Sequence, residues 1–241
     1  MSICLEGTHL RYAVRNNQIV NDVTIKASTA EVVGIFGPNG AGKTTTFHIL
    51  SGIIAANSGN IKFNGVDISK NTLSQRAKLG LYYLPQDNSV FRELTVKDNL
   101  FAAIETRKDL THGQQLDLVD ETLEKLRLQH ITNSMAKTVS GGERRRIEIA
   151  RLLVLEPKMI MLDEPFAGVD PVAVNDIQKI ILDLKTNGVG IVITDHNVRE
   201  TLKFCDRGYV MHKGSLIAEG SPEEIIGCHS VKAIYLGNTF A

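Results

Sequence analysis

Eight residues near the N-terminus have the composition and spacing of a phosphate-binding loop. Residues 37–44 read Gly-Pro-Asn-Gly-Ala-Gly-Lys-Thr and fit G-x-x-x-x-G-K-[ST], in which glycines let backbone N–H groups converge on phosphate oxygens. Lys43 would neutralise β- and γ-phosphate oxygens, and the Thr44 hydroxyl is suited to Mg²⁺. A glycine-rich turn is the alternative. Because the loop follows a strand-like run and opens a helical one, we favour phosphate binding.

Two consecutive carboxylates follow an apolar run later in the chain. Residues 159–165 read Met-Ile-Met-Leu-Asp-Glu-Pro, which places Asp163 and Glu164 at the carboxyl end of a predicted buried strand, where open α/β sheets bind ligands. We expect Asp163 to hold Mg²⁺ through water and Glu164 to activate the attacking water as general base. Alone, this run could merely end a strand. Together with the phosphate loop, it indicates a hydrolytic site.

A histidine follows the second buried run. Residues 191–196 read Ile-Val-Ile-Thr-Asp-His, so His196 is predicted at the same sheet edge as the two carboxylates. There it could contact the γ-phosphate and orient the water, whereas a lone histidine is more often structural. Its position at the strand end favours the catalytic role.

A serine, two glycines and a glutamate open an arginine-rich helical stretch. Ser140 and Glu143 have the S-x-x-E spacing of a capping box, and a helix N-terminus beside two glycines also exposes N–H donors suited to a second phosphate contact. Both roles are compatible. The arginines at 144–146 could simply form a solvated face. Gln86, after Leu-Pro, could sense the metal or could be a turn residue.

The elements that must position these residues can be read from the hydrophobic pattern. Residues 3–36 contain short β-rich runs, and the phosphate loop leads into a helix that Gly52 can end. Residues 95–130 have helical periodicity. The apolar runs at 159–162 and 191–193 are separated by a helical stretch, which indicates a buried parallel sheet.

The C-terminal part predicts a hairpin followed by a helix. Lys213 and Gly214 separate two short apolar runs, as in a two-residue hairpin turn. Residues 221–224 read Ser-Pro-Glu-Glu, which is typical of a capped helix start with Pro at its first position.

Composition limits the classes of function. The chain has 241 residues, with 27 Lys plus Arg against 27 Asp plus Glu, so nonspecific binding to nucleic acid is not expected. Its apolar runs fall far short of the roughly 18 residues that a membrane helix needs. Cys4, Cys205 and Cys228 have no metal-ligand or paired spacing, and no targeting segment opens the chain. We therefore expect a reduced, cytoplasmic protein.

In this order and spacing, the motifs resemble the complete set of an ABC transporter ATP-binding subunit, over nearly the whole chain. The resemblance implies an α/β fold with a RecA-like P-loop NTPase core, an N-terminal antiparallel β part and an inserted α-helical subdomain. It implies one domain, 1–241, with 1–87 and 157–241 as the nucleotide-binding core and 88–156 as the helical subdomain. Val139 and the Ala-Gly-Val-Asp run that ends at Asp170 depart from the usual motifs without removing a catalytic group.

The resemblance also implies ATP and Mg²⁺ as ligands and a head-to-tail homodimer, or a pair with a relative, that shares each nucleotide between two subunits. Tyr12 would stack on adenine, although it could equally be an ordinary strand aromatic. Asp170 would lie in the loop that joins the two sites. The implied metal ligands are Thr44, Gln86 and Asp163, and the catalytic residues are Glu164, His196 and Lys43. The implied nucleotide contacts are Tyr12, Gly37, Pro38, Asn39, Gly40, Ala41, Gly42, Lys43, Thr44, Thr45, Gln86, Ser140, Gly141, Gly142 and Asp170.

A narrower resemblance is to the ATP-binding subunits of the lipopolysaccharide export system. It rests on the runs Gly142-Glu-Arg-Arg-Arg-Ile-Glu-Ile-Ala-Arg, Asp163-Glu-Pro-Phe-Ala-Gly-Val-Asp-Pro and Asp195-His-Asn-Val-Arg-Glu-Thr-Leu, and on Tyr235-Leu-Gly. It implies work with two transmembrane subunits at the cytoplasmic face of the inner membrane. Their docking site would include Phe91 and Arg92, and the alternative for Phe91 is a core aromatic.

Other functions share parts of this pattern. The ATPase of a branched-chain amino acid importer has the same architecture, and its membrane subunits would distinguish it. ABC ATPases that act on nucleic acid or ribosomes usually carry two cassettes or long coiled-coil insertions, and this sequence has neither. A regulator that binds nucleotide without hydrolysis is disfavoured because both Glu164 and His196 are present.

Overall fold

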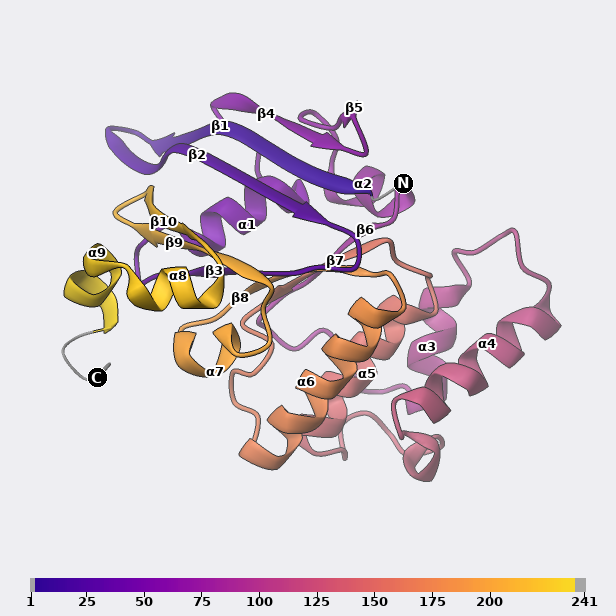
Figure 1. Cartoon of the computed structure of the whole chain (residues 1–241). Coiled ribbons are helices and arrows are strands. Elements are labelled where there is room, and N and C mark those ends of the chain that lie inside the picture. The colour runs from indigo at the N-terminus through magenta and orange to yellow at the C-terminus, as the bar shows by residue number, and fades with distance from the viewer. Residues whose placement is uncertain (1–2, 237–241) are drawn as a thin grey trace. The chain divides into compact units, whose positions relative to one another are not determined.

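The computed structural model describes residues 3–236, which form two compact units (Figure 1). The sheet unit comprises the chain up to residue 83, residues 158–165 and the chain from residue 182. The helical unit comprises residues 84–157 and 166–181. The subdomain bounds predicted from the sequence stay a prediction, and the Tyr235-Leu-Gly run extends beyond the described residues.

An antiparallel sheet forms the N-terminal part of the sheet unit. Its order is β2-β1-β4-β5, with β1 at Cys4–Val14, β2 at Asn17–Ser28, β4 at Ser58–Phe63 and β5 at Val66–Asp67. Buried and exposed positions alternate along parts of β1 and β2, as expected for strands with one face toward a core. The predicted β-rich N-terminal region is therefore confirmed.

A six-stranded sheet in the order β10-β9-β3-β8-β7-β6 forms the rest of this unit. The three strands β3, β7 and β8 are buried at every position and pair in parallel, as their continuous apolar runs predict. β9 and β10 form the expected antiparallel hairpin, with Lys213 at φ +45° and Gly214 at φ +82° in its turn. The strands are β3 at Val32–Phe36, β6 at Leu81–Leu84, β7 at Met159–Asp163, β8 at Gly190–Thr194, β9 at Arg207–His212 and β10 at Ser215–Gly220.

Helix α1, Lys43–Ser51, lies between the two sheets (Figure 1) and buries Phe47, Ile49 and Leu50 in their shared core. It ends at Gly52, whose φ of +85° makes the expected left-handed cap. The shorter helices are α2 at Leu73–Lys78, α7 at Val198–Leu202, α8 at Pro222–Gly227 and α9 at His229–Val231, followed by a π-helical turn at Lys232–Leu236. Ser221 caps α8 with a capping box and Pro222 at its start, as predicted.

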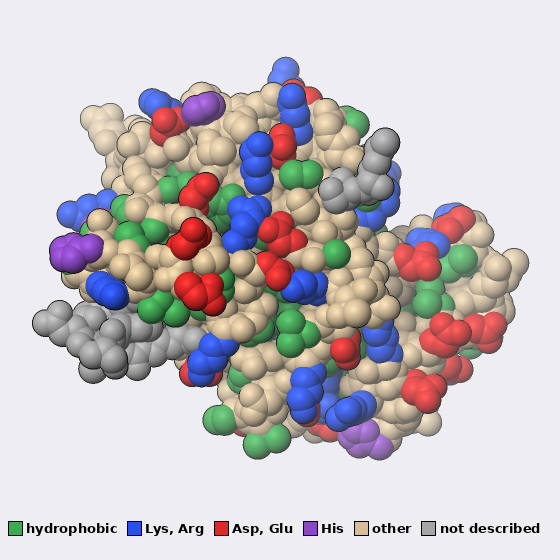
Figure 2. Space-filling view, viewed as in Figure 1, with side chains coloured by type: hydrophobic (Ala, Val, Ile, Leu, Met, Phe, Trp, Pro, Cys, Tyr) green, Lys and Arg blue, Asp and Glu red, His purple; other side chains and the backbone are tan. Residues whose placement is uncertain are grey.

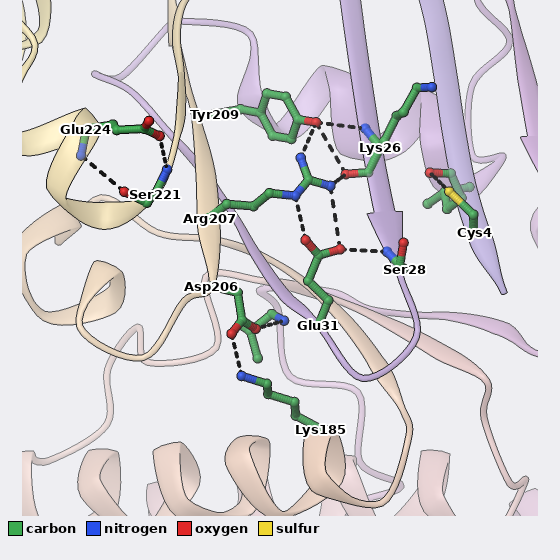
Figure 3. A network of polar contacts seen from close by, with 12 residues as sticks. Cys4, Lys26, Ser28, Glu31, Lys185, Asp206, Arg207, Tyr209, Ser221 and Glu224 are labelled. Carbon is green, nitrogen blue, oxygen red and sulfur yellow. Dashed lines mark hydrogen bonds and ion pairs between the residues drawn. The ribbon is translucent and has the colours of Figure 1, made fainter. Parts of the chain in front are cut away.

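A polar network connects the two sheets at one end (Figure 3). Arg207 of β9 contacts the carboxylate of Glu31, donates to the carbonyl of Lys26 on β2 and donates to the hydroxyl of Tyr209. Glu31 in turn accepts from the backbone N–H of Ser28 at 2.8 Å. The guanidinium therefore joins strands that are distant in the sequence.

The helical unit contains three packed helices and the start of a fourth. Leucines of the stretch with predicted helical periodicity, including Leu123 and Leu126, are buried. Helix α6 begins in this unit and ends in the sheet unit. The helices are α3 at Val96–Ile104, α4 at His112–Lys125, α5 at Gly141–Leu153 and α6 at Pro171–Thr186, with a 3₁₀ turn at Gln129–Ile131.

The predicted α/β fold class is confirmed. Figure 2 shows acidic and basic side chains interspersed on the face drawn, in keeping with equal numbers of the two charges. Within residues 3–236, none of the helices combines the length and the apolar character required to cross a membrane.

Candidate functional site

The phosphate loop connects the buried strand β3 to α1. Gly40 and Gly42 have φ values of +77° and +99°, and a Cβ added at Gly42 would lie 2.7 Å from the carbonyl oxygen of Ile19. At Gly37 a Cβ would lie 2.3 Å from a backbone oxygen of Met211. Glycine is therefore required by conformation and by space. The N-terminus of α1 has no side-chain cap, which leaves its amides suited to binding an anion.

Lys43 contributes a buried cation to this loop. Its side chain donates to the carbonyl oxygens of Gly37 at 2.7 Å and Pro38 at 3.2 Å. Burial lowers the pKa of Lys43, while the carboxylates of Glu164 and Asp163 act in the opposite direction. The ammonium group thus lies in the electrostatic field of both predicted acidic residues.

Asp163 lies at the end of β7 and is 3% exposed. Its Oδ1 accepts a hydrogen bond from the Thr194 hydroxyl at 2.5 Å, and its Oδ2 accepts one from the Tyr83 hydroxyl at 3.1 Å. Asp163 and Thr194 are paired residues in the parallel register of β7 and β8, which explains their contact. A carboxylate with two donors retains lone pairs for a further ligand.

Glu164 has an unusual backbone conformation, with φ +42°. Its N–H donates to the carbonyl and hydroxyl oxygens of Thr194, both at 3.1 Å. Its side chain lies beside His196, with 3.5 Å between Glu164 Oε2 and His196 Nδ1. A non-glycine residue in the left-handed region costs on the order of 1 kcal/mol and is often found at active sites.

His196 is presented by a well-anchored turn after β8. The preceding Asp195 is 3% exposed and accepts from the Thr201 hydroxyl at 2.5 Å and from the Asn197 N–H at 2.8 Å. The imidazole itself is exposed, and its Nδ1 also lies 3.6 Å from Asp195. The exposed imidazole therefore lies beside the Glu164 carboxylate, and hydrogen bonds to Asp195 anchor the turn that carries it.

The donor chemistry of this edge fits Mg²⁺. Thr44 offers an exposed hydroxyl and Asp163 a buried carboxylate, and Mg²⁺ prefers oxygen ligands together with phosphate and water. The described part of the chain contains no group of three or more Asp, Glu, His or Cys residues that could hold a metal ion by itself. Phosphate oxygens and water would complete the coordination.

In the helical unit, Ser140 caps α5 in the predicted capping box. The Ser140 hydroxyl accepts from the N–H of Glu143 at 3.3 Å, and the Glu143 carboxylate accepts from the N–H of Ser140 at 2.8 Å. These bonds lower the pKa of Glu143, with the Ser140 side chain as the largest cause. Ser140 and Gly141 are exposed, so capping leaves the serine accessible.

Gly142 and Asp170 meet at the start of α6. A Cβ added at Gly142 would lie 2.4 Å from the Cβ of Ala173, so close packing requires glycine there. Asp170 accepts from the N–H groups of Val172 and Ala173 at 3.1 and 3.0 Å. The structure therefore gives Asp170 a capping role, and its place in the loop between two sites stays a prediction.

An open polar cavity of about 110 Å³ lies nearby in the helical unit. It contains Gln86, which is exposed, beside the N-terminus of α5. Its lining residues are Gln86, Asn88, Gly141, Arg144, Arg145, Glu148, Ala167, Gly168 and Val169.

The alternative of a solvated arginine face is wrong for Arg145. Its side chain is 5% exposed, donates to the carbonyl oxygen of Pro85 at 3.0 Å and pairs with Glu148 at 2.8 Å. Glu148 also accepts from the N–H of Ser89 at 2.6 Å. The charge run therefore includes a buried pair, because the i,i+3 spacing places Glu148 next to Arg145 on one helix face.

Phe91 is not a core aromatic, so that alternative from the sequence analysis is wrong. Its side chain is 47% exposed, and the guanidinium of Arg151 lies 4.5 Å from the ring centroid. Arg92 is also exposed. Tyr12, by contrast, is partly buried against the core of the sheet unit, and its contact with adenine stays a prediction.

Thr194 and Tyr83 are the contacts of Asp163 that the sequence analysis missed. Thr194 could have been found from its place directly before Asp-His at a strand end. Tyr83 carries no comparable signal, because its contact depends on which strands are neighbours.

Comparisons with known proteins agree with this geometry. The family model for ABC transporters matches residues 20–167. The lipopolysaccharide export system ATP-binding protein LptB of Haemophilus influenzae is 49% identical over 100% of this chain and 99% of its own length. LptB of Escherichia coli K12 is 49% identical over 98% of each chain. A crystal structure of an ATP-binding cassette of an ABC transporter in its ADP conformation has a TM-score of 0.87, 30% identity and coverage of 99% of this chain and 100% of its own.

Proposed function

Since this chain belongs to the ABC transporter family of ATP-binding proteins, we propose that it is the ATP-hydrolysing subunit that powers lipopolysaccharide export. The identity of 49% to LptB proteins over nearly the full length supports the export assignment. The observation that carries the chemistry is the gathering of Lys43, Asp163, Glu164 and His196 at one edge of the sheet unit.

Each of these residues has a distinct task in the proposed reaction. Glu164 takes a proton from the attacking water, and His196 orients that water and the γ-phosphate. Lys43 and the amides of α1 bind the β- and γ-phosphates. Thr44 and Asp163 would hold Mg²⁺, with Gln86 as a further ligand, and the metal would offset negative charge on the phosphate oxygens.

We propose a two-fold homodimer in which Ser140, Gly141 and Gly142 of one copy complete the nucleotide site of the other. The exposure of Ser140 and Gly141 at the N-terminus of α5 supports this arrangement, because the first N–H groups of a helix have no partner within the helix and attract anions. Asp170 would then lie in the loop between the two sites, and Tyr12 would stack on adenine.

Phe91 and Arg92 are proposed to dock the transmembrane subunits, which would hold this chain at the cytoplasmic face of the inner membrane. The Phe91 ring is exposed and lies 4.5 Å from the Arg151 guanidinium, measured to the ring centroid. An exposed aromatic ring of this kind is a suitable anchor for a short cytoplasmic helix. The Arg92 guanidinium could bind a carboxylate or a helix C-terminus.

The function is tested by purification of the chain from membranes together with its partners. We expect two transmembrane subunits of the lipopolysaccharide export system and Mg²⁺-dependent ATP hydrolysis. Co-purification with branched-chain amino acid importer subunits would instead favour the rival assignment.

The docking site is tested separately with Phe91→Ala and Arg92→Ala. Each should leave ATP binding intact and weaken assembly by about thirtyfold, the effect of losing an interface anchor. Leu94→Ala, an exposed position close by in the sequence, serves as the matched control. Normal assembly of both variants would exclude this docking site.

A further inference from the structure

A row of hydrogen-bonded side chains connects α1 to the carboxylate of Asp163. Nε2 of His48, on the last turn of α1, lies 3.2 Å from the hydroxyl oxygen of Tyr83. The Tyr83 hydroxyl donates in turn to Oδ2 of Asp163 at 3.1 Å. The helix that begins at Lys43 of the phosphate loop is therefore also connected to Asp163 through Tyr83.

The direction of these bonds is fixed by chemistry. A tyrosine hydroxyl has one hydrogen, and here it is directed to a carboxylate, which can only accept when ionised. The bond from His48 must then be donated by an Nε2–H group. On the opposite oxygen, Thr194 donates to Asp163 and accepts from the N–H of Glu164. Both oxygens of Asp163 are thus oriented by hydroxyl donors.

The ring of Tyr83 packs against two aromatic side chains of α1. Its ring makes edge contacts with Phe47 at 6.5 Å and with His48 at 5.9 Å between centroids. Phe47 is fully buried, and the partly buried ring of Tyr83 packs against the same core of the sheet unit. These contacts hold the Tyr83 ring beside α1, from where its hydroxyl reaches Asp163.

We propose that Tyr83 is a positioning residue for Asp163, and that His48 holds the Tyr83 hydroxyl in its donating direction. The inference rests on the proposed function, in which Asp163 holds Mg²⁺. Partners that orient a metal ligand commonly change metal affinity by 10- to 100-fold when they are removed. Tyr83 would set how tightly the nucleotide-bound protein holds its metal, without contacting the nucleotide.

The test compares Tyr83→Phe with Tyr82→Phe. The first variant keeps the packed ring and removes the hydroxyl. The second removes the hydroxyl of the preceding residue, whose side chain is expected on the other face of β6 because side chains alternate along a strand. Mn²⁺ is titrated into each protein with saturating ADP, and free Mn²⁺ is measured by electron paramagnetic resonance. We expect about tenfold weaker Mn²⁺ binding in Tyr83→Phe only. ADP affinity in the absence of metal should be unchanged.

Variants of His48 test the second step. His48→Leu removes the donor and should weaken Mn²⁺ binding in the same direction, whereas His48→Gln keeps an N–H donor and should restore most of the affinity. The double variant His48→Leu with Tyr83→Phe should bind Mn²⁺ no more weakly than Tyr83→Phe alone, because both changes break one chain. Additive losses would show that His48 does not act through Tyr83.

The outcomes separate this inference from the proposed function. Asp163→Asn should abolish most of the Mn²⁺ binding, and a protein that binds Mn²⁺ equally well with this change would overturn the metal role of Asp163. If Asp163→Asn fails to bind Mn²⁺ while Tyr83→Phe binds Mn²⁺ like the unchanged protein, the metal role of Asp163 stands and only the positioning role of Tyr83 is wrong. Turnover of Tyr83→Phe should also recover at high Mg²⁺, which a general structural defect would not allow.

Discussion

Nδ1 of His196 lies 3.5 Å from Oε2 of Glu164, at the edge where β7 and β8 end side by side. Two features set up this approach. The N–H of Glu164 is bonded to Thr194, and Asp195 is anchored by the Thr201 hydroxyl. The two side chains thus meet because adjacent parallel strands place consecutive functional residues at one sheet edge.

Glu164→Gln should bind ATP normally and hydrolyse it at least about a hundredfold more slowly, because the amide is nearly isosteric and cannot accept the proton of water. Phosphate release measures turnover, and calorimetry measures binding. With ATP and Mg²⁺ the variant should form a stable dimer in light scattering. Turnover close to that of the unchanged protein would contradict the general-base role.

Lys43→Ala should lose tight ATP binding, since the phosphates lose the cation of their loop. Lys62→Ala, which removes an exposed lysine of the same sheet unit, should bind ATP normally in the same calorimetric titration. If Lys43→Ala bound ATP as tightly as the unchanged protein, the proposed phosphate-binding role of this loop would be wrong.

Arg76→Met should lower the free energy of unfolding by about 3 kcal/mol or more, because buried carbonyls lose their donor. Arg76 is 1% exposed and donates to backbone oxygens that include those of Ile49 and Leu50, at the end of α1. Burial lowers the pKa of Arg76 to about 10, so it stays charged at neutral pH. Urea unfolding measures the loss. Arg76→Lys should recover only part of the lost unfolding free energy, because an ammonium group has fewer hydrogen-bond donors than a guanidinium group.

A loss of less than about 1 kcal/mol in Arg76→Met would mean that water or other donors satisfy these carbonyls.

The capping box at Ser140 should make stability depend on pH. The folded-state pKa of Glu143 is lowered, so its contribution is present above the ordinary carboxyl pKa and is lost as pH falls through the folded-state value. As the pH falls from the ordinary carboxyl pKa through the folded-state value, the unchanged protein should therefore lose more unfolding free energy than Glu143→Gln, which keeps the capping geometry. Equal losses in urea unfolding at acidic pH would contradict this role.

Ser140→Ala should also lose about 1 kcal/mol at neutral pH, the usual effect of removing a helix cap. The ATP hydrolysis rate of Ser140→Ala, measured alone and in a mixture with Lys43→Ala, distinguishes a capping role from a role across the dimer. When it is mixed with Lys43→Ala, activity above either parent would support a site shared between two copies.

The sequence by itself determined the order of the elements and the chemistry at their ends. The loop 37–44, the two buried runs and the turn at Lys213 and Gly214 each depend on local rules, because glycine conformations, apolar patterning and caps involve neighbours in the chain. The phosphate loop and the strand-end carboxylates could therefore be predicted with their residue numbers.

Only the tertiary structure decided which side chains meet across the sheet. The contact of Tyr83 with Asp163 joins residues 80 apart, and that of Thr194 with Asp163 joins residues 31 apart. The burial of Arg145 and the exposure of Phe91 likewise depend on how helices and loops pack around them. Such contacts follow from strand order, register and close packing, which are properties of the assembled chain that a local pattern does not contain.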